Sequence, residues 1–478
     1  MKKIIAIYIA ILAFTACTKD FDTINDDPKN APEVPAATLF SNAERNLVDN
    51  VNTPEVNTNV FRLMAQYWAQ TTYADESQYN IDTRNIPRNF WNAMYTDVLR
   101  NFSEADSLIK ADTTFLDPQQ KINQLAVNEI LTVYSWSVLV NIYGNIPYSQ
   151  ALDYREITPK YDDAATIYAD LLTRLDEALT SLDTDSESFG SADLIYGGNV
   201  SKWIKFGNSL KLRLAMTVAD VESFSSTVKT AVESAAPNVF TSNDDNALLN
   251  YLQSPPNTNP VWVQLIQSGR TDYVASNTIL NIMKPLADPR LPSYFNPETE
   301  TGQFLAGTYG NVNSTSGFSL PSDKLTSQTF PGVLLDYSEV EFYLAEAVER
   351  GYTVGGTAAE HYNKAVTASI TYWGGTSEQA TAYLAKPQVN YATASGDYKQ
   401  KIGTQKWLAL YNRGIEGWTE YRRLDAPTFN EVEEPQGDFP LRFTYSDQER
   451  NLNRANYSEA AQAIGGDEVT TRIFWDKF

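Results

Sequence analysis

The sequence predicts an all-α fold of paired helices interrupted by long loops, and three observations lead to this prediction. Apolar side chains recur at three- and four-residue steps over residues 337–348, the spacing of one helix face. Thr357 and Glu360 have the spacing of a capping box, which starts a second helix soon after the first. The chain has 478 residues, 42% of them hydrophobic, and one cysteine, so a large buried core rather than disulfides must hold the fold.

The clearest helical hairpin covers residues 337–373. Ser338 with Glu341 forms a predicted capping box for its first helix, and Gly351 stands where a left-handed residue would end that helix. The second helix carries Ala358, Tyr362, Ala365, Val366 and Trp373 after its own capping box. Its small and aromatic residues have a spacing that resembles the second helix of a tetratricopeptide unit.

Further helix pairs follow from weaker patterns of the same kind. We expect residues 120–143 to pair with 162–182, 200–220 with 224–235, and 402–424 with 447–464. Between them, residues 236–262 and 285–333 are rich in Pro, Asn, Ser and Gly. Loops of this length in a compact protein are usually functional surfaces, and short strands are expected within them.

The N-terminus has the pattern of a secretory signal. Two lysines precede an apolar run from Ile4 to Phe14, which is shorter than the roughly 20 residues of a membrane-spanning helix. The segment Phe14-Thr15-Ala16-Cys17 resembles the cleavage and acylation site of bacterial lipoproteins, although Phe14 replaces the usual branched aliphatic residue. We therefore expect a signal peptide over 1–16 and lipidation of Cys17; the alternative is an ordinary signal with an incidental cysteine.

The following residues 17–35 are polar and rich in Asp, Asn and Pro, which predicts a tether. Residues 36–478 then form the helical nutrient-binding domain, as one elaborated domain or two closely packed lobes. The formal charge of −22 disfavours nucleic acid and anionic lipid surfaces as partners and leaves neutral or cationic ligands open.

Catalytic signatures are missing from the sequence. His361 is the only histidine, and its place inside the second helix of the hairpin indicates a partly exposed structural residue. The acidic stretch Asp183–Glu187 begins like a calcium loop but lacks the glycine and the final glutamate, so it predicts a solvated loop. We expect no cofactor and no metal site. A pair of carboxylates facing each other, as in a glycoside hydrolase, stays open as an alternative.

Aromatic residues interleaved with planar polar ones are the more informative signal. They are dense over residues 66–79 and 89–95, and this mixture is typical of sugar binding, because sugar C–H faces stack on rings while hydroxyl groups bond to Asn, Gln, Asp and Glu. Trp91 also has the spacing of a core residue. The candidate ligand-binding residues are Trp68, Tyr73, Tyr79, Trp91, Trp262 and Tyr309.

Several passages together resemble the SusD/RagB family of outer-membrane lipoproteins, in particular the SusD-like branch described as starch-binding and outer-membrane-associated. They lie in the family's order over nearly the whole chain, at 66–70 (QYWAQ), 86–91 (IPRNFW), 141–148 (NIYGNIPY), 288–292 (DPRLP), 337–341 (YSEVE) and 417–424 (GWTEYRRL). Lys19-Asp20 after Cys17 resembles the signal that sends such lipoproteins to the outer leaflet.

The resemblance implies a SusD-like fold with about four tetratricopeptide-like hairpins and a binding function without catalysis. It also implies a partner, a SusC-like TonB-dependent outer-membrane barrel, on which the protein would act as a lid that captures oligosaccharide at the cell exterior. A lid of the same architecture that captures peptides is the first alternative, and a surface glycoside hydrolase is the second.

Overall fold

The computed structural model describes residues 34–478, and within them four hairpins of consecutive helices pack side by side. They are α6 (Pro118–Tyr143) with α7 (Ala164–Ser181), α8 (Val200–Thr217) with α9 (Ser225–Ala235), α13 (Tyr337–Glu349) with α14 (Ala358–Tyr372), and α16 (Tyr398–Ala409) with α17 (Gly414–Leu424). The prediction of an all-α fold with about four helical hairpins is confirmed. The predicted signal peptide, Cys17 and the tether up to residue 33 lie outside the described residues.

One predicted helix pair is wrong. Residues 402–424 are not a single helix paired with 447–464; they belong to α16 and α17, which pack on each other. Arg413 lies between the two helices, is buried, and forms ion pairs with Asp336 (3.0 Å) and Glu339. These ion pairs fix the turn between α16 and α17. Helical periodicity could not predict them, because both partners of Arg413 are about 75 residues away in sequence.

The start of α14 follows its prediction. The Thr357 hydroxyl accepts a hydrogen bond from the backbone N–H of Glu360, and the Glu360 side chain accepts one from the N–H of Thr357, which completes the capping box. Gly351, just after α13, has φ +79°, the left-handed conformation predicted for it.

The start of α13 differs from its prediction. Asp336 caps this helix, and its side chain accepts a hydrogen bond from Glu339 N at 2.8 Å. Ser338 instead donates to Ala365 O at 2.8 Å and so joins the two helices of the hairpin. Asp and Ser cap helices equally well, so the sequence did not distinguish two candidates two residues apart.

Short strands and short helices fill the long connections. The strands form three antiparallel pairs among the described residues: β1 (Trp68–Gln70) with β5 (Tyr273–Ala275), β2 (Ile146–Pro147) with β3 (Tyr161–Asp162), and β4 (Ala247–Leu249) with β6 (Gly332–Leu335). The remaining α-helices are α2 (Ala36–Asn52), α3 (Phe61–Met64), α4 (Ile86–Asn92), α5 (Arg100–Ala111), α10 (Pro260–Trp262), α11 (Asn277–Met283), α12 (Leu291–Tyr294), α15 (Ser377–Leu384), α18 (Asp447–Leu452) and α19 (Arg454–Ala463). Two π-helical turns, η1 (Ala93–Leu99) and η6 (Val263–Gln267), continue α4 and α10.

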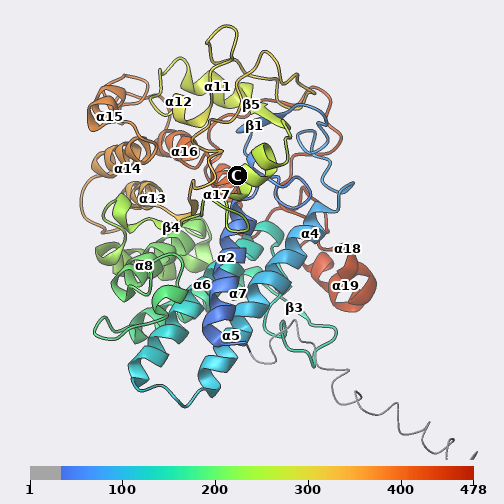
Figure 1. Ribbon diagram of the computed structural model, residues 1–478, viewed down its shortest axis with the longest axis vertical. Helices are drawn as coiled ribbons and strands as arrows, with labels where there is room; N and C mark the ends of the chain where they lie inside the picture. Colours follow the sequence, from blue (N-terminus) through green and yellow to red (C-terminus); the bar gives the residue numbers. More distant parts are fainter. Residues whose placement is uncertain (1–33) are drawn as a thin grey trace, which may run out of the picture.

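The hairpins and the loops occupy different parts of the molecule. In Figure 1, α15, α14, α13 and α8 follow one side, and α2, α5, α6 and α7 form the lower half. The strands β1 and β5 lie in the upper half with α11, α12 and the connecting loops. The helical part therefore serves as the scaffold. Many of the loops gather at the end opposite to α5 and α7, whereas the connection that carries β2 and β3 lies beside these helices.

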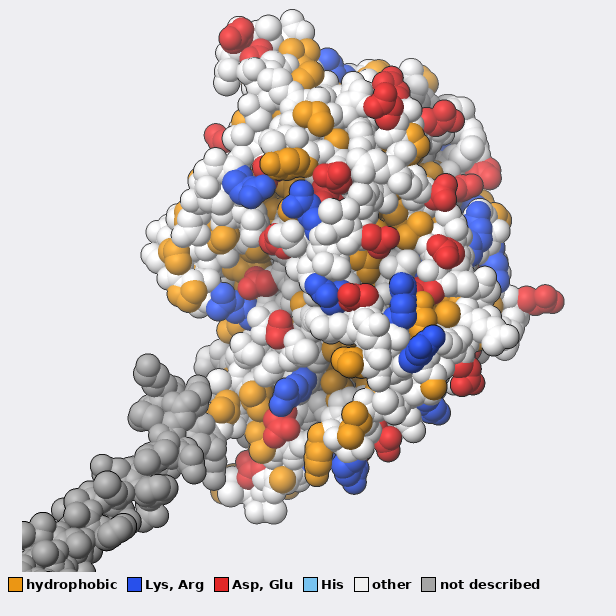
Figure 2. Space-filling model, turned by 90° about the vertical axis from the view of Figure 1, so that its right-hand side faces the viewer, with side chains coloured by type: hydrophobic (Ala, Val, Ile, Leu, Met, Phe, Trp, Pro, Cys, Tyr) orange, Lys and Arg blue, Asp and Glu red, His pale blue; other side chains and the backbone are white. Residues whose placement is uncertain are grey.

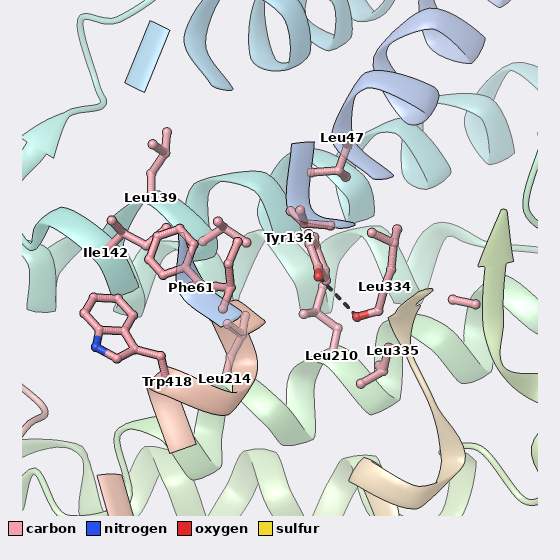
Figure 3. Packing of buried hydrophobic residues seen from close by; sticks show 14 of the residues in the cluster. Leu47, Phe61, Tyr134, Leu139, Ile142, Leu210, Leu214, Leu334, Leu335 and Trp418 are labelled. Carbon is pink, nitrogen blue, oxygen red and sulfur yellow. Dashed lines mark hydrogen bonds between the residues drawn. The ribbon is translucent and has the colours of Figure 1, made fainter. Parts of the chain in front are cut away.

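The main core lies where α2, α3, α6, α8, α17 and β6 meet (Figure 3). Apolar side chains from these elements are almost completely buried, and the Tyr134 hydroxyl donates to Leu334 O at 3.1 Å across the core. A smaller cluster, including Phe342, Tyr362 and Ile402, lies between α13, α14, α15 and α16. Helix α13 contributes to both clusters and so joins them.

Helix α6 is long and apolar enough to span a membrane by length and composition. Its most apolar window is 83% buried inside the fold, with neighbours on α5, α7 and α8. A helix that is apolar on all sides and enclosed by other helices is the central core helix of a globular domain.

Candidate functional site

The pairing of β1 with β5 brings two loops together at the loop end of the molecule. Gln70 lies opposite Tyr273 in this pair, and the pairing is extended by hydrogen bonds from Thr71 N to Asp272 O (3.0 Å) and from Thr71 Oγ1 to Thr271 O (2.6 Å). The loop over residues 71–85 therefore starts beside the segment 268–272, about 200 residues away in sequence.

The 71–85 loop is organised by a buried polar network. Gln70 Nε2 donates to Glu76 Oε2 at 2.6 Å, and Gln70 Oε1 accepts from the backbone N–H (2.9 Å) and the hydroxyl (2.6 Å) of Ser77. Glu76 is fully buried, and its other oxygen accepts from Arg84 Nε at 2.6 Å. A satisfied network of this kind rigidifies the loop and fixes the guanidinium group of Arg84.

Tyr73 lies above this network with much of its ring in solvent. Its side chain is 58% exposed, and Arg84 Cζ lies 5.6 Å from the ring centroid, at cation–π distance. Arg270 Nε donates to Asp272 Oδ2 at 2.6 Å nearby. These side chains form a shallow slot, which we call the Tyr73 slot, lined by Val56, Gln70, Thr72, Tyr73, Arg84, Arg270, Asp272 and Tyr273.

Three of the six predicted ligand-binding aromatics are in the protein interior. Trp68 is 1% exposed, donates its indole N–H to Tyr411 Oη at 2.9 Å and packs on the Tyr273 ring at 5.0 Å. Trp91 is 5% exposed and packs on Tyr95 and Tyr143. Tyr309 is 1% exposed. Their ring faces contact protein, so in this conformation they support neighbouring segments rather than offer a surface.

The other three candidates reach solvent to different extents. Tyr73 is the most exposed, Trp262 is half-buried at the end of α10, and Tyr79 is half-buried between the rings of Tyr309 (6.5 Å) and Phe439 (5.4 Å). Burial raises the pKa of Tyr79 to about 12. Tyr79 therefore stays protonated at neutral pH, and its ring is partly covered by these two neighbours.

Sequence reasoning missed the charged members of the slot. Arg84, Arg270 and Asp272 carry no motif, and Arg84 joins the slot only because Glu76 holds it. Arg270 and Asp272 arrive through the pairing of β5 with β1. A local signal existed only for Tyr73 and Gln70, which belong to the aromatic and amide-rich stretch at 66–79.

The single histidine has a structural place. His361 is 6% exposed rather than partly exposed; its Nδ1 lies 2.6 Å from Glu341 Oε2, and its Nε2 lies 2.8 Å from Gly355 O. Burial lowers the pKa of His361, but the hydrogen bonds to Glu341 and to Gly355 outweigh this effect and raise it above its usual value. Both ring nitrogens of His361 face acceptor oxygens, so this side chain joins α14 to α13 and to the turn between them.

One face of the molecule carries charges of both signs. On the face drawn in Figure 2, Asp and Glu side chains alternate with Lys and Arg, although the chain as a whole carries a formal charge of −22. Within residues 34–478, no cluster of three His, Cys, Asp or Glu side chains has the arrangement of a metal site. A face with charges of both signs favours a neutral, polar ligand over a strongly charged one.

A helical-hairpin scaffold that presents an aromatic slot between loops is typical of a ligand-binding protein. Residues 28–446 match the SusD-like family, described as starch-binding and associating with the outer membrane. Since this match spans most of the chain, the protein belongs to the SusD-like family. Members of this family bind carbohydrate and are not catalysts, so the expectation of a binding protein rather than an enzyme is confirmed.

Solved structures show the same fold over nearly the full chain. A chitin-binding protein is 28% identical with a TM-score of 0.81, covering 93% of this chain and 100% of that one. A chitin-binding SusD homologue from Flavobacterium johnsoniae is 25% identical with a TM-score of 0.79, covering 92% and 98%. A SusD homologue from Bacteroides uniformis is 25% identical with a TM-score of 0.76, covering 92% and 99%. No curated protein sequence matches.

Proposed function

We propose that the protein is a glycan-binding lipoprotein of the cell surface and that the Tyr73 slot is part of its binding site. The observation that carries this proposal is the exposed ring of Tyr73, backed by Arg84 and flanked by the Arg270–Asp272 pair. A sugar ring stacked on Tyr73 would bury apolar C–H groups, while its hydroxyl groups would bond to the guanidinium and carboxylate groups.

The slot has a volume of only about 10 Å³, so a sugar unit would lie over it, on the exposed ring of Tyr73, and not inside it. Trp262 is half-buried and directly precedes the segment 263–272, and we assign its ring to the ligand as the second one. Tyr79 would contact the ligand with the edge of its ring. Trp68, Trp91 and Tyr309 are buried, and they stabilise the segments that form this surface. An extended site of this kind suits an oligosaccharide chain rather than a monosaccharide.

Two relatives at 25–28% identity are chitin-binding proteins, so chito-oligosaccharides are the first ligands to test, with malto-oligosaccharides second. Isothermal titration calorimetry on the protein lacking residues 1–17 should detect binding of one of these two series of oligosaccharides. Replacing Tyr73 with alanine should weaken it about tenfold or more, because burial of an aromatic ring contributes roughly 1.5–3 kcal/mol.

Tyr154→Ala provides the matched control, because Tyr154 is an exposed tyrosine (92%) that does not line the Tyr73 slot. It should bind glycan as the wild type does. Unchanged affinity in Tyr73→Ala would reject the slot as the site, and unchanged affinity in Trp262→Ala would reject Trp262 as the second ring. Displacement of bound glycan by mixed peptides would instead favour the alternative of a peptide-binding lid.

We further propose that Cys17 carries the lipid anchor, that the protein faces the cell exterior, and that it acts as the lid of a SusC-like TonB-dependent barrel. Purification from native outer membranes through a C-terminal tag, followed by mass spectrometry, tests all three parts. An acylated Cys17 and a co-purified barrel would support them, and protease shaving of intact cells should remove the protein. A solitary, unmodified protein would contradict them.

A further inference from the structure

Helix α2, the first helix of the described chain, is fastened to the loop over residues 189–198. The ring of Phe40 stacks on that of Phe189, with the centroids 3.7 Å apart and the planes inclined by 7°. Glu44 Oε2 accepts a hydrogen bond from the backbone N–H of Leu194 at 2.7 Å. Because this loop connects α7 to α8, these contacts attach α2 to the hairpins of the scaffold.

The carboxyl group of Glu44 is buried next to a second carboxyl group. Glu44 is 0% exposed, and its Oε1 has no hydrogen-bond partner among residues 34–478. The carboxyl group of Asp193, which is 3% exposed, lies within hydrogen-bonding distance of the Glu44 side chain. No lysine or arginine of the described residues forms an ion pair with either group. Two buried carboxyl groups this close cannot both be charged without a large cost, so one of them holds a proton.

The hydrogen bonds indicate which of the two carboxyl groups is charged. Asp193 accepts from the backbone N–H groups of Ile195 (3.0 Å), Tyr196 (2.9 Å) and Gly198 (2.8 Å) and from the indole N–H of Trp203 (2.7 Å). Four donors of this kind stabilise a carboxylate. Glu44, in contrast, receives no donor at Oε1. The proton therefore belongs on Glu44.

The charged groups on the elements around α2 and the 189–198 loop do not offset the charge of this pair. Those bonded to partners of their own are Arg45 with Asp49, Lys110 with Asp106, Lys205 with Asp245, Lys202 with Asp244 O, Lys121 with Asp112 O, Glu129 with Arg174, Glu416 with Arg213, Glu420 with Arg423, and Arg422 with Leu441 O. Asp97, Arg100 and Glu104 are exposed. In the loop itself, Tyr196 donates to Asp245 O at 2.7 Å.

We propose that Glu44 is protonated in the folded protein at neutral pH and that its proton holds α2 on the 189–198 loop. With the proton, the unpartnered Oε1 becomes a donor that faces an acceptor. Without it, two negative charges would lie next to each other in a buried region, and separation of the loop from α2 would relieve their repulsion. The attachment of the first helix to the scaffold therefore depends on pH, and alkaline conditions release it.

The pKa of Glu44 agrees with this arrangement. Burial, and then the charge of Asp193, raise the pKa of Glu44 well above its usual value. The folded state thus binds this proton more tightly than the unfolded state, so the contribution of Glu44 to stability is complete below about pH 4.3 and is lost as the pH rises through the raised pKa. Glu339 and Glu346 have lowered pKa values and act in the opposite direction at acid pH, so the two effects can be separated.

Hydrogen exchange of the unmodified protein tests the release directly. The amide of Leu194 is bonded to Glu44 and that of Ile195 to Asp193. Both should lose protection by about tenfold or more between pH 6 and pH 9, after correction for the intrinsic exchange rate. Amides in the middle of α14, which belongs to another hairpin, should keep theirs.

Glu44→Gln removes the titration and keeps the shape of the side chain. Its amide oxygen can still accept from Leu194, and its amide N–H replaces the proton at every pH. The variant should therefore keep its protection between pH 6 and pH 9 to within about twofold and melt no lower than the wild type at pH 9. The infrared difference spectrum of wild type minus variant at pH 7 should contain the carbonyl band of a protonated carboxylic acid.

Glu104→Gln is the matched control, because Glu104 is an exposed glutamate on the neighbouring helix α5. This variant should exchange and melt as the wild type does, and its difference spectrum should lack the carboxylic acid band.

Four results would overturn the proposal. Absence of the infrared band from the Glu44→Gln difference spectrum would show that Glu44 is charged, and equal loss of protection in wild type and Glu44→Gln would place the titrating group elsewhere. A rise in melting temperature with calcium chloride that disappears in Glu44→Gln would assign the two carboxyl groups to a bound cation. The fourth result needs no variant and holds even if Glu44→Gln does not fold: constant protection of Leu194 and Ile195 in the unmodified protein from pH 6 to pH 9.

Discussion

Gly417 illustrates how a single residue sets the distance between two elements. A Cβ at this position of α17 would lie 2.4 Å from the hydroxyl oxygen of Tyr67, which itself donates to Trp407 O at 2.6 Å. Tyr67 and Trp407 are fully buried, so neither can move aside easily. The glycine in the passage 417–424 therefore serves the packing of the scaffold and does not contact a ligand.

We expect Gly417→Ala to destabilise the protein by about 1–3 kcal/mol, the range for overpacking a core. The measurement is the melting temperature by differential scanning calorimetry. Gly207→Ala is the control, because its added methyl group would meet the end of the flexible Leu179 side chain. A loss in Gly207→Ala as large as that in Gly417→Ala would contradict the argument that the rigid Tyr67 contact is decisive.

At the scale of elements, helices α13 and α17 are joined by buried ion pairs. Arg423 of α17 contacts Glu346 of α13 at 2.5 Å and Glu420 of its own helix at 2.6 Å, and all three side chains are almost fully buried. Such pairs add little net stability over apolar packing, but removing one member leaves the others charged and unpaired. The helix contact therefore depends on all members of the group.

Arg423→Met should accordingly cost about 3–5 kcal/mol, because Glu346 and Glu420 would stay buried with only Arg350 and Lys406 left as their cations. Chemical denaturation followed by circular dichroism measures this loss. Lys229→Met provides the comparison, since Lys229 forms an exposed i,i+4 pair with Glu233 whose removal should change stability by about 0.5 kcal/mol or less. Similar small effects in both variants would show that the buried group is not needed to join the helices.

Among the pairings of helices and strands, some could be predicted from the sequence and others could not. The hairpin 337–373 followed from periodicity and capping. The pairs 120–143 with 162–182 and 200–220 with 224–235 followed from periodicity, because consecutive helices usually pack on each other. The split of 402–424 at Arg413 and the pairing of β1 with β5 depend on contacts between distant residues. Local patterns carry no information about such contacts.

At the scale of the whole molecule, the buried glutamates make stability depend on pH. Burial alone raises the pKa of Glu346, but the charge of Arg423 outweighs this effect and lowers it below the usual value. The pKa of Glu339 is likewise lowered, by Arg213 and Arg413 against the effect of burial. A glutamate in the unfolded chain has a pKa of about 4.3, so below this pH the unfolded state binds more protons than the folded state.

Stability is therefore expected to be kept above about pH 4.5 and lost progressively as the pH falls below it. Melting temperatures from pH 7 to pH 3 at constant ionic strength test this. Glu346→Gln removes one of the titrating groups, so it should start from a lower melting temperature and lose less of it on acidification. A melting temperature that stays constant down to pH 3, or an equal slope in the variant, would contradict the assignment.

By itself the sequence determined the helical class, most of the hairpins, the family and the absence of the usual catalytic motifs, because periodicity, capping and family passages are local or ordered along the chain. Only the tertiary structure decided which aromatic rings reach solvent. It buried Trp68, Trp91 and Tyr309, left Tyr73 exposed, and placed Arg84, Arg270 and Asp272 beside it. Exposure is set by what packs against a side chain from distant segments, and no local pattern of residue types contains that information.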